Sequence, residues 1–231
     1  MGGLYYYGFD SLYLYLVVPA IIIALWSQIK VKTAFSKFSA YRTDISGADA
    51  ARRVMELNGV YGVKIERVSG NLTDHYDPRT NTIRLSDSVY DACSISAVGV
   101  AAHEAGHAVQ YAKGYFPIKL RSVILPICNL GSQLSLPLLI IGLIFNFYFL
   151  VKLGVIFFCG ALIFQLVTLP VEFNASRRAM ASLKDGAVLL TENDVKYVKK
   201  VLSAAAMTYI AAALVSLAQL IRLIAITNKR R

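Results

Sequence analysis

The sequence predicts a mostly α-helical, multi-pass membrane protein with one polar region that holds a small β-sheet or hairpin beside a helix. Of its 231 residues, 56% are hydrophobic and only 16% are charged, a composition too apolar for an ordinary soluble domain of this length. The apolar residues gather in three long blocks, and turn-forming residues gather between the first two blocks. Long apolar blocks indicate membrane spans, and the turn-rich stretch indicates short strands.

The first apolar block, residues 4–26, contains Asp10 as its only charge. It meets the length of about twenty apolar residues that a membrane-spanning helix needs. Because residues 1–10 contain no Lys or Arg and the apolar run is long, we expect a retained anchor and not a cleaved signal peptide. Aromatic residues gather at membrane interfaces, and four are expected there: Tyr5, Tyr6, Tyr7 and Trp26.

The second block, residues 123–171, is too long for one span and holds a single charge, Lys152. Its length predicts two membrane helices joined by a tight turn at residues 146–152. Pro126 and Pro137 fall inside the first of these helices. Neighbouring helices can satisfy the carbonyls that a proline frees in a membrane, so we interpret both prolines as helical.

The third block, residues 201–226, is a weaker candidate for a fourth membrane helix because it contains Gln219 and Arg222. Residues 27–122 are expected in the cytoplasm by the positive-inside rule, because they begin with Lys30, Lys32, Lys37 and Arg42. A spanning last helix would then place the basic residues 229–231 outside. Either that helix does not cross the membrane, or the rule fails at this end.

The polar region begins with a short amphipathic helix. Ser46 and Asp49 resemble a capping box, and Asn58-Gly59 is a helix stop. Residues 63–85 alternate short extended runs with turn residues, which predicts a small sheet or hairpin. Ser94 or Ser96 can cap the next helix, which ends near Gly114.

The helix before Gly114 contains an H-E-x-x-H motif, His103-Glu104-Ala105-Gly106-His107. The four-residue step places both imidazoles on one face of a helix, where they can share a zinc ion. Glu104, beside the first ligand, is placed to take a proton from a water that the metal activates. The alternative is that two of the chain's three histidines have this spacing by chance and pack in a core helix.

A hydrolytic zinc site needs a third protein ligand. We favour Glu172, because it stands where the predicted membrane hairpin returns to the membrane surface. The alternative is an ion pair of Glu172 with Arg177 or Arg178, since charges next to a membrane usually have partners. The acidic residues downstream of the motif are Glu172, Asp185, Glu192 and Asp194.

Four segments together resemble a known family, the YugP-type membrane zinc metallopeptidases of bacteria, which are related in plan to the HtpX and CAAX prenyl protease group. The resemblance covers nearly the whole chain. Its segments are residues 26–32 (WSQIKVK), 74–78 (DHYDP), 100–110 (VAAHEAGHAVQ) and 169–178 (LPVEFNASRR).

The resemblance implies a zincin-like catalytic region with one Zn2+ per chain, held by His103, His107 and Glu172, with Glu104 as general base. The related group often has an acidic residue four positions after the third ligand, where this chain has Ser176. By analogy with peptidases of this plan, substrate would add as a strand along residues 82–86.

His75, the remaining histidine, could contact the transition state if its turn folds over the metal. The more common alternative is an exposed turn residue. The three cysteines are far apart and indicate neither disulfides nor a thiolate metal site. The net charge of +10 has no basic stripe with interleaved aromatics, which argues against a nucleic-acid partner.

We therefore expect one integral membrane peptidase in the cell membrane, with its site facing the cytoplasm and peptides or proteins, including membrane proteins, as substrates. Two other functions stay open: a non-catalytic scaffold with a structural metal site, and a site-2-type protease that cuts within the bilayer. The expected parts of residues 1–231 are the anchor 4–26, the catalytic region 27–122, the hairpin 123–171, the third-ligand segment 172–200 and the helix 201–226.

Overall fold

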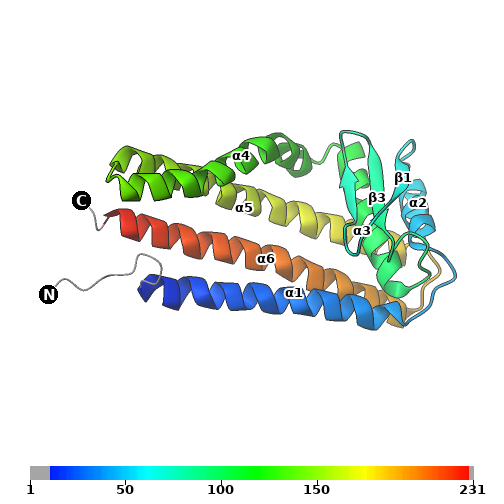
Figure 1. The fold of residues 1–231 in the computed structure, drawn as a ribbon. Helices are drawn as coiled ribbons and strands as arrows, with labels where there is room; N and C mark the ends of the chain where they lie inside the picture. Colours follow the sequence, from blue (N-terminus) through cyan, green and yellow to red (C-terminus); the bar gives the residue numbers. More distant parts are fainter. Residues whose placement is uncertain (1–10, 229–231) are drawn as a thin grey trace. The chain divides into compact units, whose positions relative to one another are not determined.

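The computed structural model describes residues 11–228, which are mostly helical with one small sheet (Figure 1). This confirms the predicted fold class. The expected aromatic belt at Tyr5–Tyr7, the start of the first span and the basic residues 229–231 lie outside the described residues. The elements are a π-helical turn Tyr13–Val17, α1 Val18–Ser39, α2 Gly47–Leu57, β1 Lys64–Val68, β2 His75–Asp77, β3 Thr82–Ser86, α3 Ile95–Ala112, α4 Phe116–Ile144, α5 Tyr148–Lys184 and α6 Glu192–Asn228.

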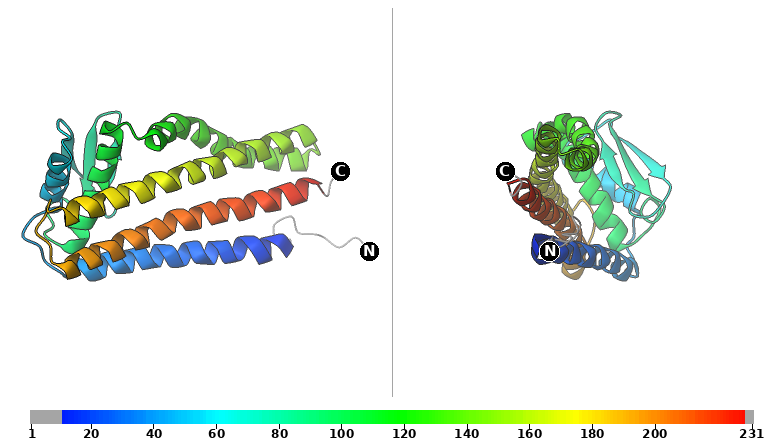
Figure 2. Two further views of the ribbon diagram at one scale, coloured as in Figure 1. Left: turned by 180° about the vertical axis from the view of Figure 1, so that it is seen from behind. Right: turned by 60° about the vertical axis from the view of Figure 1, so that its left-hand side comes forward.

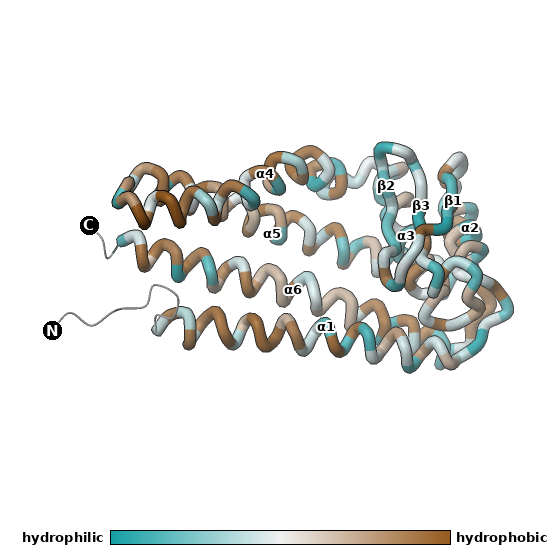
Figure 3. Tube along the Cα trace, in the orientation of Figure 1, coloured by the Kyte–Doolittle hydropathy of each residue, from teal (hydrophilic) through white to brown (hydrophobic). Residues whose placement is uncertain are grey.

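Four helical stretches in residues 11–228 are long and apolar enough to cross a membrane. Figure 3 shows apolar residues along these helices and more polar residues on α2 and the strands. The last stretch contains the third apolar block, so by length and composition the C-terminal helix also qualifies as a span. The four stretches are Tyr13–Ser39, Phe116–Ile144, Tyr148–Lys184 and Glu192–Asn228.

The chain forms two compact units. A membrane unit contains the described residues up to Gln28, residues 120–169, and the described residues from Thr208 onward. A polar unit contains residues 29–119 and 170–207. The helices α1, α4, α5 and α6 each contribute to both units. That the chain acts as a single peptidase unit stays a prediction.

All four candidate membrane helices extend beyond the apolar blocks that predicted them, and α6 begins at Glu192 instead of residue 201. The first continues to Ser39 instead of ending at residue 26, and α4 begins at Phe116 instead of residue 123. Helix α5 continues to Lys184, so Glu172 lies inside this helix and not in a separate segment. The physical reason is that hydropathy ends where polar residues begin, whereas a helix ends at a stop signal. Residues 27–39 and 172–184 contain neither Gly nor Pro, and α5 ends just before Gly186, whose φ is +92°.

The polar unit is built around α3. This helix packs against α2 and against β2 and β3, and it lies beside them in Figures 1 and 2. The N-caps of α2 and α3 agree with the sequence: the Ser46 hydroxyl accepts from the Asp49 N–H at 3.1 Å, and Ser94 accepts from Ala97 at 3.3 Å. Gly114, with φ of +68°, follows the end of α3 as predicted.

The sheet has the strand order β1-β3-β2, with β1 parallel and β2 antiparallel to β3. The expectation that a substrate strand adds along residues 82–86, as the edge of the sheet, is wrong, because this strand lies in the centre of the sheet between β1 and β2. The turn residues at positions 78–81 indicate the hairpin between β2 and β3. The pairing of β1 with β3 is not local, so no turn pattern indicates it.

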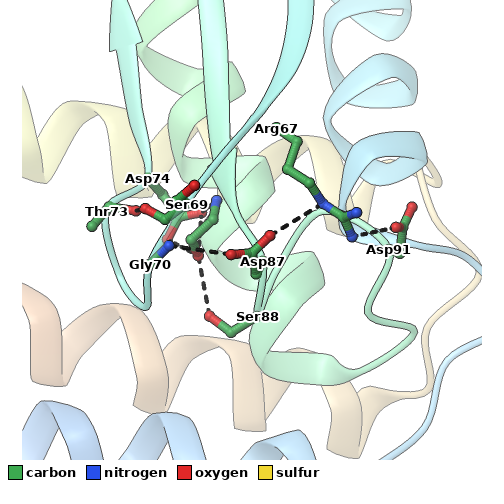
Figure 4. A network of polar contacts seen from close by, with 9 residues as sticks. Arg67, Ser69, Gly70, Thr73, Asp74, Asp87, Ser88 and Asp91 are labelled. Atoms are coloured by element: carbon green, nitrogen blue, oxygen red, sulfur yellow. Dashed lines mark hydrogen bonds and ion pairs between the residues drawn. The ribbon is translucent and has the colours of Figure 1, made fainter.

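A polar network fixes the loop that leads into β2 (Figure 4). Arg67 forms ion pairs with Asp87 and Asp91, and the Asp87 carboxylate also accepts from the Gly70 N–H at 3.2 Å. Asp74 accepts from the Ser86 N–H at 2.7 Å, which ties the end of this loop to β3. Exposed ion pairs stabilise a fold by little, so we interpret the network as positioning the loop and β2.

Candidate metal centre

The two histidines of the motif lie one turn apart on α3, and a close helix contact brings Glu172 to them. The contact is at Gly106, where a Cβ atom would lie 2.6 Å from the Ala175 carbonyl oxygen of α5. Only glycine allows the two backbones to approach so closely. Gly106 therefore lets α5 approach the metal-binding face of α3.

The side chains of His103, His107 and Glu172 form a compact, buried cluster. Glu172 Oε2 lies 3.2 Å from His103 Nε2 and 3.5 Å from His107 Nε2. One ligand atom from each residue lies within 4.8 Å of the others. Zinc holds nitrogen and oxygen ligands at about 2.0–2.2 Å in tetrahedral geometry, so neighbouring ligand atoms should be about 3.4 Å apart. The two imidazole–carboxylate distances therefore fit a zinc site with two His and one Glu ligand.

Each imidazole is held through its other nitrogen. His103 Nδ1 lies 3.1 Å from the Ser176 hydroxyl, and His107 Nδ1 lies 3.0 Å from the Gln110 amide oxygen. An amide oxygen only accepts, so Nδ1 of His107 carries the proton and Nε2 keeps a lone pair for a metal. The partner of His103 is thus the hydroxyl of Ser176, at the position where the related group often has an acidic residue, and the partner of His107 is an amide.

Gln110 also joins α3 to the turn of α5 that carries Glu172. Its side chain is fully buried, and its amide nitrogen donates to the Val171 carbonyl at 2.8 Å and to Asn174 Oδ1 at 3.0 Å. The sequence analysis did not identify Gln110. Its position three residues after His107, on the same helix face, is the signal that could have found it.

Glu104 is buried on α3 beside the ligands. Burial raises the pKa of its carboxyl to about 7, the nearby His103 opposes this increase, and the carboxylates of Glu172 and Asp74 add to it. The backbone of Tyr76 in β2 donates a hydrogen bond to Glu104. A pKa near neutral suits a group that both takes and gives a proton, and a bound cation would lower the pKa again.

The structure does not bring His75 to the three ligands. Its ring is exposed, and Nδ1 lies 2.8 Å from the Thr73 carbonyl oxygen. The adjacent Tyr76 packs against the core, with its ring 6.2 Å from that of Tyr111 on α3. Because side chains alternate along a strand, His75 points to the other face of the sheet. Its contact with a transition state stays a prediction.

The alternative interpretation was that Glu172 forms an ion pair with Arg177 or Arg178 at the membrane interface. In the structure Glu172 contacts the two imidazoles, while Arg178 donates to Asn174 Oδ1 at 2.8 Å and lies over the ring of Tyr115. The arrangement favours Glu172 as the third ligand.

Comparison with known proteins shows the family of the chain. The family described as "Putative neutral zinc metallopeptidase" matches residues 13–228, a range that includes all three candidate ligands. The chain is 45% identical over 217 residues to "Putative membrane protease YugP" of Bacillus subtilis (strain 168), and the match covers 93% of this chain and 96% of that protein. No solved structure matches.

We expect the substitution Gly106→Ala to destabilise the polar unit and weaken metal binding. The added methyl group would force α5 away from α3, and overpacking of this kind costs about 1–3 kcal/mol of unfolding free energy. The measurements are the thermal unfolding midpoint and the zinc content of purified protein. Gly160→Ala is a matched control within α5, because the nearest atom to its Cβ would be 4.0 Å away. Equal effects of both substitutions would contradict the close-contact argument.

We expect Gln110→Leu to lower zinc affinity by about 10–100-fold, the usual cost of losing the partner of a ligating histidine. Leucine is similar in volume but offers no acceptor for His107 and no donor for Val171. Competition with a chelator of known affinity measures the effect. Thermal unfolding of the metal-free variant shows whether the substitution also lowers general stability. Unchanged zinc affinity in a folded variant would show that Gln110 does not orient His107.

Proposed function

This chain belongs to the neutral zinc metallopeptidase family, and on that premise we propose that it is a membrane-embedded, zinc-dependent endopeptidase that acts at the cytoplasmic membrane surface. The observation that carries the proposal is the cluster of His103, His107 and Glu172, in which both imidazole–carboxylate distances fit zinc. Glu104, buried next to the cluster, supplies the base that hydrolysis needs.

A zinc ion at this site would supply a Lewis acid that makes water nucleophilic at neutral pH and polarises the peptide carbonyl. Glu104 takes the proton of the attacking water and passes it to the leaving amine. Burial favours the neutral form of this carboxyl, so Glu104 can hold the proton between the two steps. Ser176 and Gln110 keep the imidazoles oriented throughout.

The substrate is proposed to be a peptide or protein segment, including parts of membrane proteins. With β3 in the centre of the sheet, the edge that can accept a substrate strand next to the site is β2. This strand packs against α3, and its Tyr76 backbone already contacts Glu104. A strand added along β2 would therefore lie beside the base.

The two alternative functions fit the geometry less well. A structural zinc site is usually closed by four protein ligands, whereas three candidate ligands gather here beside a buried carboxylate. A protease that cuts within the bilayer would carry its motif on a span, but α3 is not among the four candidate spans of residues 11–228. Both observations favour a hydrolytic site outside the bilayer core.

We expect wild-type protein purified in detergent to hold one zinc per chain, and Glu172→Ala to lose it. Glu104→Gln should keep the metal and lose peptide hydrolysis by several orders of magnitude, because the amide cannot accept the proton. Elemental analysis and cleavage of a denatured protein substrate measure the two quantities. An equal zinc content in wild type and Glu172→Ala would show that the third ligand is another residue.

The cytoplasmic orientation predicts a labelling pattern in intact cells. In a variant without native cysteines, Cys introduced at the exposed position Glu56 should react with a membrane-impermeant maleimide only after permeabilisation. Cys introduced at Phe147, in the turn of the membrane hairpin and 54% exposed, should react without it. The opposite pattern would place the site outside the cell.

A further inference from the structure

Tyr111 lies one turn beyond the second histidine of α3. It is four positions after His107, so the two side chains lie on the same helix face. Side chains of an α-helix lean toward its N-terminus, so the Tyr111 ring leans toward the turn that carries His107. Its ring centre is 6.2 Å from that of Tyr76, which belongs to β2, the strand whose backbone reaches Glu104. Tyr111 is therefore next to both the ligand face of α3 and β2.

The hydroxyl of Tyr111 is accessible to a substrate. The residue is 37% exposed, whereas the two histidines on the same helix face are buried or nearly buried. Within residues 11–228, the Tyr111 hydroxyl has no hydrogen-bond partner. The neighbouring Tyr76 differs, since its hydroxyl donates to Asn81 Oδ1 at 2.8 Å. One of the two contacting tyrosines thus uses its hydroxyl within the fold, and the other offers it at the surface.

The separation of Tyr111 from the proposed base matches a short stretch of extended peptide. Glu104 and Tyr111 are seven residues apart, about 10 Å along α3, and about three residues of an extended strand cover that length. Tyr76 contacts Glu104 through its backbone and Tyr111 through its ring, so β2 extends along this stretch of α3. A peptide added along β2 with its scissile bond at Glu104 would pass Tyr111 about three residues away.

We propose that Tyr111 is a substrate-binding residue that selects extended peptides reaching about three residues beyond the scissile bond. Its hydroxyl donates a hydrogen bond to a backbone carbonyl oxygen of the substrate. Every residue of a peptide has this carbonyl, so the contact requires length and an extended backbone and not a particular side chain. The inference rests on the proposed function, because it assumes that the substrate adds along β2 beside Glu104.

The first test compares Tyr111→Phe with wild type in the cleavage of a long fluorogenic peptide. Loss of one neutral hydrogen bond should raise KM by about 3–10-fold. The contact forms equally in the ground state and the transition state, so kcat should stay within about twofold. The matched control is Tyr61→Phe, which removes the same hydroxyl from a residue that is 76% exposed and lies outside the helices and strands. It should behave as wild type does.

Peptide length separates a substrate contact from a structural effect. The peptide is shortened stepwise from its N-terminus in one series and from its C-terminus in another. In one series only, the KM difference between Tyr111→Phe and wild type should disappear once fewer than about three residues remain on that side. A disturbed fold would instead raise KM at every length. Tyr76→Phe, which loses the bond to Asn81, should lower the thermal unfolding midpoint, whereas Tyr111→Phe should not.

A binding measurement gives a second result that does not require cleavage. The long peptide is bound to Glu104→Gln protein and followed by fluorescence anisotropy, and adding Tyr111→Phe to this protein should raise Kd by about 3–10-fold. Equal Kd values with and without Tyr111→Phe, a loss confined to kcat, or a KM difference that ignores peptide length would each overturn the proposal. If wild type cleaves no peptide, the proposed function fails, while the Kd comparison still decides whether Tyr111 binds substrate.

Discussion

The close contact of α3 and α5 at Gly106 is the constraint on which the metal cluster depends. The Ala175 carbonyl occupies the space of a Cβ atom, and this sets the distance from Glu172 to the two imidazoles at 3.2 and 3.5 Å. The hydrogen bonds of Gln110 to Val171 and Asn174 hold the same two helices in register. Ligand geometry is therefore a property of a helix pair and not of the H-E-x-x-H segment alone.

The site brings several acidic groups into a small buried volume. Burial raises the pKa of Glu104 to about 7, and burial also raises the pKa of Asp74 against the hydrogen bonds from Ser86. Bringing carboxyl groups together without water is unfavourable unless positive charge or protons compensate. A divalent cation on Glu172 supplies that charge, so the electrostatics and the distances favour the same kind of occupant.

The sheet contacts Glu104, the proposed base, through strand β2. The network of Arg67, Asp87 and Asp91 fixes the loop before β2, and Asp74 anchors its end to β3. The backbone of Tyr76 then reaches Glu104. A loop of ordinary turn residues thus has two effects. It orders the edge strand β2, and through β2 it supports the carboxyl group that the proposed hydrolysis uses.

The amino-acid sequence by itself determined the membrane class, the caps of α2 and α3, the hairpin turn and the two histidines with their intervening glutamate, because each of these depends on residues a few positions apart. Only the tertiary structure decided which acidic residue joins the histidines, that β3 is central, that His75 faces away and that Gln110 and Ser176 hold the rings. The pairing of β1 with β3 and the contacts of α3 with Val171, Glu172 and Ser176 join segments about 18 to 73 residues apart, and local periodicity and turn chemistry carry no information about such pairings. Helix ends differ from the predicted ones for another reason, since hydropathy indicates the bilayer, whereas a helix such as α5 continues through polar residues until a stop signal such as Gly186.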